Sequence, residues 1–186
     1  PIRQPWHEMF PLNGPAWSLF FEYIGNFLYA TVVRRFSKAL LTLFVVLSGA
    51  ALVRLAVGSE TGSVLGGHEL SGPQFLIGMT RLLYPFFCGV LLFRLGKRIR
   101  LRGGFWICSL VLAAILFLPR IGGETELWKN GLYEAFCIIV LFPLIVLAGA
   151  GSPIRGRVSV GICKFLGEIS FPLYIIHYPF VYLYMA

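Results

Sequence analysis

The sequence predicts an all-α fold, a polytopic bundle of about six transmembrane helices. Of its 186 residues, 58% are hydrophobic and only 13% are charged, whereas a soluble domain is roughly half apolar and a quarter charged. The mean hydropathy is +0.80, and the apolar residues gather in runs close to the ~20 residues that cross a membrane. These observations exclude a water-soluble enzyme. Because no internal repeat or linker interrupts the runs, we expect one membrane domain over residues 1–186.

Each predicted span is a long apolar run bounded by polar or glycine-containing segments. In chain order the runs are Ala16–Val33, Ala39–Val57, Gln74–Phe93, Phe105–Leu118, Leu132–Gly149 and Phe165 to about Tyr184. The fourth run is the shortest, and it needs flanking residues to cross a core of about 30 Å. The four cysteines stand far apart, so the sequence predicts neither a metal site nor a disulfide framework.

Basic residues gather in every second connecting segment, within a net charge of +8. Eleven of them follow the first and third runs or precede the sixth: Arg34, Arg35, Lys38, Arg94, Lys97, Arg98, Arg100, Arg102, Arg155, Arg157 and Lys164. The other side of the membrane receives Arg3, Arg120 and Lys129. Because basic loops stay in the cytoplasm, both ends of the chain are predicted to face outward. Topology explains the charge, so we expect no nucleic-acid partner.

Glu22 is the clearest polar residue within a predicted span. Ser18, Glu22 and Asn26 recur every fourth residue, and Tyr29 follows seven residues after Glu22, so all four share one helical face. An ionisable side chain inside a membrane is costly unless it is paired or faces a cavity. This face is therefore either part of a functional site or a helix contact joined by polar groups.

Arg81 is the second such residue, with Tyr84 and Cys88 on the same face of the third run. Glu22 and Arg81 enter from the same side and lie at similar depths, about 10 Å below the outer boundary. We expect the two to pair. The pair is either structural or directed at a substrate, because buried ion pairs serve both purposes.

The last run carries a third polar face. Ser170, Tyr174 and His177 follow one another at a spacing of four and three residues, between Pro172 and Pro179. His177 is expected near the middle of the membrane. A single histidine in an aromatic helix is more often a packing residue than a base, so the residues alone favour packing here.

Three classes of protein remain open on these residues: a membrane enzyme, a transporter or carrier, and a structural subunit. Transporters often consist of two repeated halves, and no such repeat is found. A structural subunit has no need of charged residues within its spans. These two points favour the enzyme.

Two long segments resemble the acyltransferase-3 family of bacterial multi-pass membrane proteins. The segment LNGPAWSLFFE (Leu12–Glu22) is similar to the family's N-G-P-x-W-S-L-x-x-E motif, and LGEISFPLYIIHYP (Leu166–Pro179) is similar to its late L-G-x-I-S-Y-x-L-Y-L-x-H-x-P segment. Arg81 with Phe86–Gly89 is more loosely similar to its R-x-F-x-x-G span. The order of the segments is that of the family.

The resemblance implies transfer of an acetyl or other short acyl group from acyl-CoA to a hydroxyl of a cell-surface carbohydrate or glycolipid. It implies no permanently bound cofactor, no metal, and a place in the bacterial plasma membrane. Among the polar residues of the spans, Glu22 and Arg81 are our first candidates for catalysis in a supporting role. The candidates for substrate binding are Trp17, Ser18, Asn26, Tyr84, Ser170, Tyr174 and His177. The acceptor glycan, the acyl chain and the oligomeric state leave no trace in the sequence.

The chain also departs from the family pattern. Family members have about ten spans, and a basic residue and a histidine in the first span carry acyl transfer. No residue here matches them, so we expect these spans to be roughly the fourth to the ninth, and the 186-residue chain to be inactive on its own. Phe171 replaces the usual tyrosine of the second motif.

The topology can be tested with single cysteines in a cysteine-free background. We expect Ser37→Cys, Gly96→Cys and Gly156→Cys to be shielded in intact cells, because basic segments stay inside. Ser63→Cys and Gly123→Cys should react with a membrane-impermeant maleimide. Labelling of Gly96→Cys in intact cells would reverse the assignment.

Overall fold

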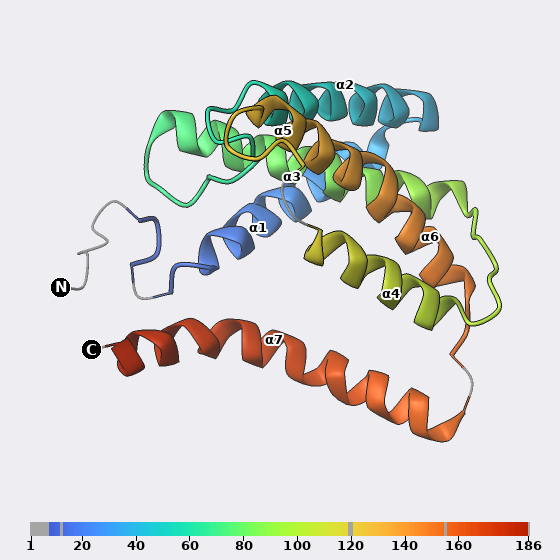
Figure 1. The fold of residues 1–186 in the computed structure, drawn as a ribbon. Helices are drawn as coiled ribbons and strands as arrows, with labels where there is room; N and C mark the ends of the chain where they lie inside the picture. The colour runs from blue at the N-terminus through green and yellow to red at the C-terminus, as the bar shows by residue number, and fades with distance from the viewer. Residues whose placement is uncertain (1–7, 12, 119–120, 155, 186) are drawn as a thin grey trace. The chain divides into compact units, whose positions relative to one another are not determined.

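The computed structural model describes residues 8–11, 13–118, 121–154 and 156–185 (Figure 1). This described part is all-α apart from a single bridge between Glu8 and Glu69. It falls into two compact units, each assembled from separate stretches of the chain. Unit 1 comprises residues Pro1–Ile24, Gly66–Met79 and Ile154–Ala186, and unit 2 comprises Gly25–Leu65 and Thr80–Pro153.

The helices follow the apolar runs of the sequence. They are α1 (Ala16–Thr31), η1 (Val33–Arg35), α2 (Lys38–Val57), α3 (Gly72–Leu95), α4 (Gly104–Phe117), α5 (Leu127–Phe136), η2 (Cys137–Leu141), α6 (Phe142–Gly151) and α7 (Arg157–Met185). Among the described residues, four stretches are long and apolar enough to cross a membrane: Lys38–Val57, Gly72–Leu95, Leu127–Gly151 and Arg157–Val181. α4 is a shorter apolar helix. The prediction of an all-α membrane helix bundle is confirmed.

The last helix extends beyond the run that predicted it. α7 begins at Arg157, whereas the apolar run begins at Phe165. The added turns carry charges, and Lys164 Nζ lies 3.8 Å from Glu168 Oε1 four residues on. Pairs at this spacing support a helix without adding hydrophobicity. Hydropathy therefore predicted the apolar stretch of this helix correctly but not the residue at which the helix begins.

The core of unit 2 lies where α2, α3 and α5 meet. Leu41, Leu52 and Phe87 are its largest fully buried side chains. α2 and α5 pack closely because Gly131 of α5 has no side chain: a Cβ there would lie 2.0 Å from the carbonyl oxygen of Ala56. Any larger residue at position 131 would separate the two helices.

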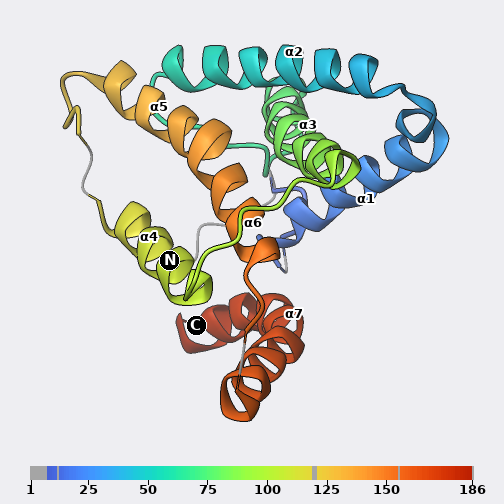
Figure 2. The same cartoon turned by 90° about the vertical axis from the view of Figure 1, so that its right-hand side faces the viewer.

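A proline and a π-helical turn interrupt the long stretch Leu127–Gly151, in which α5 and α6 follow one another (Figure 2). Pro143 has no N–H, so the carbonyl of Ile139 loses its helical donor. The hydroxyl of Tyr84 in α3 donates to this Ile139 oxygen at 2.9 Å. Since an unpaired carbonyl in an apolar interior is costly, this bond links α3 to the broken helix.

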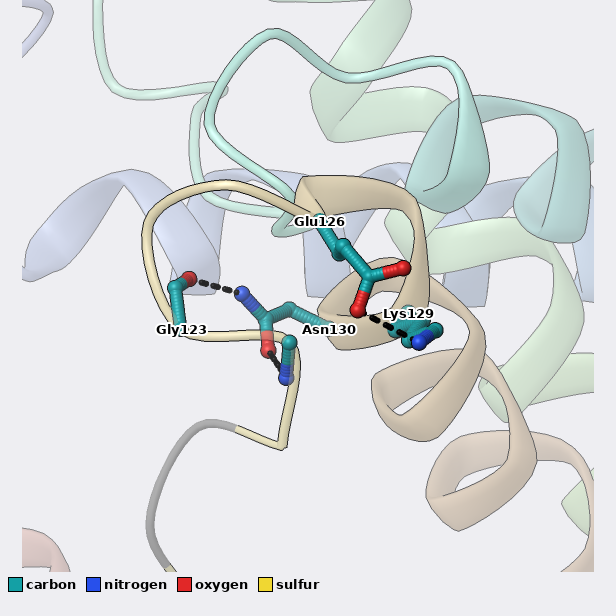
Figure 3. A network of polar contacts seen from close by, with 5 residues as sticks. Gly123, Glu126, Lys129 and Asn130 are labelled. Carbon is teal, nitrogen blue, oxygen red and sulfur yellow. Dashed lines mark hydrogen bonds and ion pairs between the residues drawn. The ribbon is translucent and has the colours of Figure 1, made fainter.

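The loop that leads into α5 is held by a network of polar contacts (Figure 3). Asn130 accepts a hydrogen bond from Gly122 N at 2.8 Å and donates one to Gly123 O at 2.9 Å. Lys129 forms an ion pair with Glu126 one turn away. Asn130 is 4% exposed, so both halves of its amide are used to fix the loop and not to bind a ligand.

The bond from Tyr84 can be tested by removing only its hydroxyl. We expect Tyr84→Phe to lower stability by about 1–3 kcal/mol, because it leaves the Ile139 carbonyl buried without a donor. Thermal unfolding in detergent measures the effect. The control is Tyr23→Phe, since Tyr23 is 77% exposed, and it should leave the midpoint unchanged. Equal midpoints for the two variants would rule out the role assigned to Tyr84.

Candidate functional site

The two segments that carry the family resemblance meet within unit 1. The hydroxyl oxygens of Ser18 in α1 and Tyr174 in α7 lie 2.6 Å apart. Tyr174 also donates a short hydrogen bond to the carbonyl of Pro15. Because Tyr174 has one hydroxyl hydrogen, Ser18 is the donor in the pair. Two residues predicted to bind substrate are thus joined.

A second contact ties the same segments together and has a proline as its cause. Pro179 lacks an N–H, so the carbonyl of Ile175 has no helical donor. Asn13 Nδ2 donates to this oxygen at 3.0 Å. The asparagine of the first motif therefore replaces a backbone donor in the second. This pairing fixes the orientation of the Asn13 amide, because its oxygen cannot face a carbonyl.

Aromatic rings surround the start of α1. Trp17 and Phe21 lie edge to face with ring centroids 6.0 Å apart, and Phe21 lies 5.5 Å from the ring of Phe75. Phe21 is only 3% exposed. This packing holds the first turns of α1 against α3.

The other predicted residues of α7 do not join this contact. Ser170 donates to the Gly167 carbonyl of its own helix at 2.8 Å. His177 Nδ1 lies 2.8 Å from the carbonyl oxygen of Tyr174 and 3.1 Å from that of Leu173. Since both partners only accept, Nδ1 carries the proton and Nε2 of the neutral ring is an acceptor. His177 is exposed.

Glu22 and Asn26 lie on an exposed face of α1, as their spacing predicts, together with Tyr29. Glu22 belongs to unit 1 and Arg81 to unit 2. The pairing of these two residues, and their roles in catalysis, stay predictions.

Arg81 lines an apolar cavity of about 310 Å³ inside unit 2. Its other lining residues are Leu52, Val64, Pro85, Cys88, Gly89, Leu92, Ile138, Phe142, Pro143 and Val146. The residues from α3 follow one helical face from Arg81 to Leu92, a length of about 16 Å along the axis. The cavity thus combines an elongated apolar wall with one cation. Tyr84, predicted on the same face, instead uses its hydroxyl on Ile139, and its substrate role stays a prediction.

Glu134 is the functional candidate that the sequence reasoning missed. Its carboxylate accepts hydrogen bonds from Ser63 Oγ at 2.9 Å and from Val64 N at 2.8 Å. Its negative charge also attracts the positive charge of Arg81. Glu134 also lines a neighbouring cavity of about 290 Å³. The signal was present, because Glu134 is an ionisable residue inside the predicted run Leu132–Gly149.

The helices and the cavities define a multi-pass membrane protein with polar groups set into apolar helices. The family model described as an acyltransferase domain, Acyl_transf_3, matches residues 3–186, essentially the whole chain. The chain therefore belongs to the acyltransferase-3 family and is a membrane acyltransferase. No curated protein and no solved structure matches the chain.

A double-mutant cycle can identify the carboxylate that is coupled to Arg81. We expect Glu134→Gln and Arg81→Gln each to destabilise the fold, because each removes one member of a pair of opposite charges set among apolar helices. The double variant should then be more stable than the two losses summed, by about 0.5–3 kcal/mol. Unfolding in detergent measures all three variants.

A second double-mutant cycle serves as the matched comparison. It combines Arg81→Gln with Glu22→Gln in place of Glu134→Gln. Coupling of Arg81 to Glu22 alone would contradict the role of Glu134, whereas coupling to both would place Arg81 between two carboxylates. Strict additivity in the Glu22 cycle would contradict the pairing predicted from the sequence.

Proposed function

We propose that the protein is an O-acyltransferase of the bacterial plasma membrane. It transfers an acetyl or other short acyl group from acyl-CoA to a hydroxyl of a cell-surface carbohydrate or glycolipid. Family membership supports acyl transfer in general. The donor and the acceptor are inferred from the chemistry of the cavity, from the polar contacts of unit 1 and from the family resemblance.

The main observation in support of the proposal is the apolar cavity of unit 2 that Arg81 lines. An acyl thioester has an apolar chain and a carbonyl oxygen that becomes negative during attack. The apolar lining suits the chain, and the guanidinium suits the oxyanion, whose stabilisation is commonly the largest single contribution to such catalysis. A volume of about 310 Å³ is at the lower end of ligand sites, which span roughly 300–1,000 Å³. Short acyl groups therefore fit best.

The reaction is a direct displacement at the thioester carbonyl. The acceptor hydroxyl oxygen bonds to the carbonyl carbon while a base removes its proton. Negative charge gathers on the carbonyl oxygen beside Arg81. The C–S bond then breaks, and the thiolate of CoA leaves and takes up a proton. The products are an ester and free CoA, so no oxidant, reductant or metal is required.

In this proposal Glu22, Ser18 and His177 orient the acceptor or the base. Trp17, Asn26, Ser170 and Tyr174 complete the surface to which the acceptor binds. No residue of this chain matches the family's acyl-transfer histidine. The base is therefore proposed to come from outside these 186 residues, and the chain alone is proposed to insert into membranes without transferring acyl groups.

The donor half of the proposal can be tested with the complete gene product in vesicles. Transfer to added glycan is measured with acetyl-, butyryl- and hexanoyl-CoA. Gly89 lines the cavity and a Cβ there would meet no atom within 4 Å, so Gly89→Leu is expected to add bulk at the cavity wall. We expect hexanoyl transfer to fall at least about ten-fold, because buried methylenes contribute about 0.8 kcal/mol each. Acetyl transfer should change little.

Gly149→Leu is the matched control. Gly149 also has open space around it and does not line the cavity, so its chain-length profile should equal that of the wild type. Equal losses with all three donors in Gly89→Leu would contradict the placement of the acyl chain. Absence of transfer from every acyl-CoA by the wild type would contradict the proposed function.

A further inference from the structure

Two cavities of unit 2 adjoin along the interrupted helix of α5 and α6. The Arg81 cavity, described above, has a volume of about 310 Å³. Its neighbour, here named the α4 cavity because residues of α4 contribute to its wall, has a volume of about 290 Å³. Ile138 and Phe142 line both cavities. The two spaces therefore meet at these two residues, which lie four positions apart on the same stretch of helix.

The polar groups that line the α4 cavity are already engaged with the protein. The Glu134 carboxylate accepts a hydrogen bond from Ser63 Oγ at 2.9 Å. The Tyr133 hydroxyl donates to the Ile115 carbonyl at 3.3 Å, and the Asn130 amide holds the loop before α5. The rest of the lining is apolar: Ile115, Leu116, Leu118, Cys137, Ile138 and Phe142. Such a space suits an alkyl chain, which gains by leaving water and needs no hydrogen bonds.

The backbone that carries Ile138 and Phe142 is anchored on both sides. Phe142 N donates to the Cys137 carbonyl and so closes the π-helical turn. The Ile139 carbonyl accepts the hydrogen bond from Tyr84 of α3 at 2.9 Å. Turns of this kind are frequent at functional sites. Because the surroundings of a large side chain relax only partly when it is removed, a smaller residue at position 142 is expected to leave open space where the cavities meet.

We propose that Phe142, supported by Ile138, separates the Arg81 cavity from the α4 cavity and thereby limits the length of the acyl chain that the enzyme accepts. The inference rests on the proposed function and adds to it a specificity-determining residue that lies outside both family motifs. With the thioester carbonyl at Arg81, a short acyl chain ends within the Arg81 cavity. A longer chain needs the α4 cavity as well, which roughly doubles the volume.

The test measures transfer from acetyl-, hexanoyl- and decanoyl-CoA by the complete gene product in vesicles. In Phe142→Ala we expect the ratio of kcat/KM for decanoyl-CoA to that for acetyl-CoA to rise at least about ten-fold. The reason is that each methylene that moves from water into an apolar space strengthens binding about four-fold. Transfer from acetyl-CoA should change little, because the acetyl group is too short to reach the α4 cavity. Phe142→Leu should give a ratio between those of the wild type and Phe142→Ala.

Phe136→Ala is the matched control, because Phe136 belongs to the same helical stretch, is 49% exposed and lines neither cavity. Its ratio should equal that of the wild type. If Phe142→Ala does not fold, Phe142→Leu and Ile138→Ala test the same partition and should raise the ratio at least about three-fold. An unchanged ratio in the folded variants, or an equal gain with all three donors, overturns the inference. A wild type that transfers decanoyl groups as fast as hexanoyl groups also overturns it.

The inference and the proposed function fail in different ways. Absence of transfer from every acyl-CoA by the wild type contradicts the proposed function. Binding of the same three acyl-CoAs without acceptor, followed by the shift of the thermal midpoint in detergent, then decides on the partition. A larger shift with decanoyl-CoA than with acetyl-CoA in Phe142→Ala, but not in the wild type, supports it, and equal patterns in the two proteins overturn it. Acyl transfer with the wild-type chain-length profile in Phe142→Ala and Phe142→Leu contradicts the partition alone.

Discussion

The structure depends on one constraint: a backbone carbonyl that a proline releases inside an apolar helix must find another donor. Water is scarce there, and an unpaired carbonyl costs several kcal/mol in hydrocarbon. At two of the prolines within its helices, Pro143 and Pro179, the fold meets this need with side chains from distant segments. Tyr84 donates to the Ile139 carbonyl in unit 2, and Asn13 donates to the Ile175 carbonyl in unit 1. Each bond ties a broken helix to a neighbouring segment, so the breaks in the helices also set the packing around the site.

This constraint separates polar residues that serve the fold from those available for chemistry. The Tyr84 hydroxyl and the Asn130 amide are fully engaged with backbone groups. Arg81 differs, because it lines a cavity and lies within the electrostatic reach of the Glu134 carboxylate. A cation beside an apolar cavity is suited to a carbonyl that gains charge. The proposed chemistry follows from that placement and from the membership of the acyltransferase-3 family.

Much of the fold could be predicted from the sequence, because hydropathy is a local property and every apolar run lies on a helix. The site was harder to predict. Ser18 and Tyr174 were singled out separately, but they are 156 residues apart, and spacing along the chain cannot bring them together. Glu134 was overlooked although the rule for ionisable residues within spans applied to it. The pairing of Glu22 with Arg81 was inferred from depth alone and stays a prediction, since depth does not fix which helices are neighbours.

The most direct measurement of the central claim is the kinetics of acetyl transfer by Arg81→Gln and Arg81→Lys in the complete gene product. If Arg81 stabilises the oxyanion, kcat for Arg81→Gln should fall by about 100- to 1,000-fold while KM for acetyl-CoA stays nearly constant. Arg81→Lys should retain more of the rate, because the charge is kept. Both variants must first be shown to be folded in detergent at the assay temperature, because Arg81→Gln is itself expected to lower the unfolding midpoint. A folded Arg81→Gln enzyme with an unchanged kcat, or with a loss confined to KM, would contradict the account.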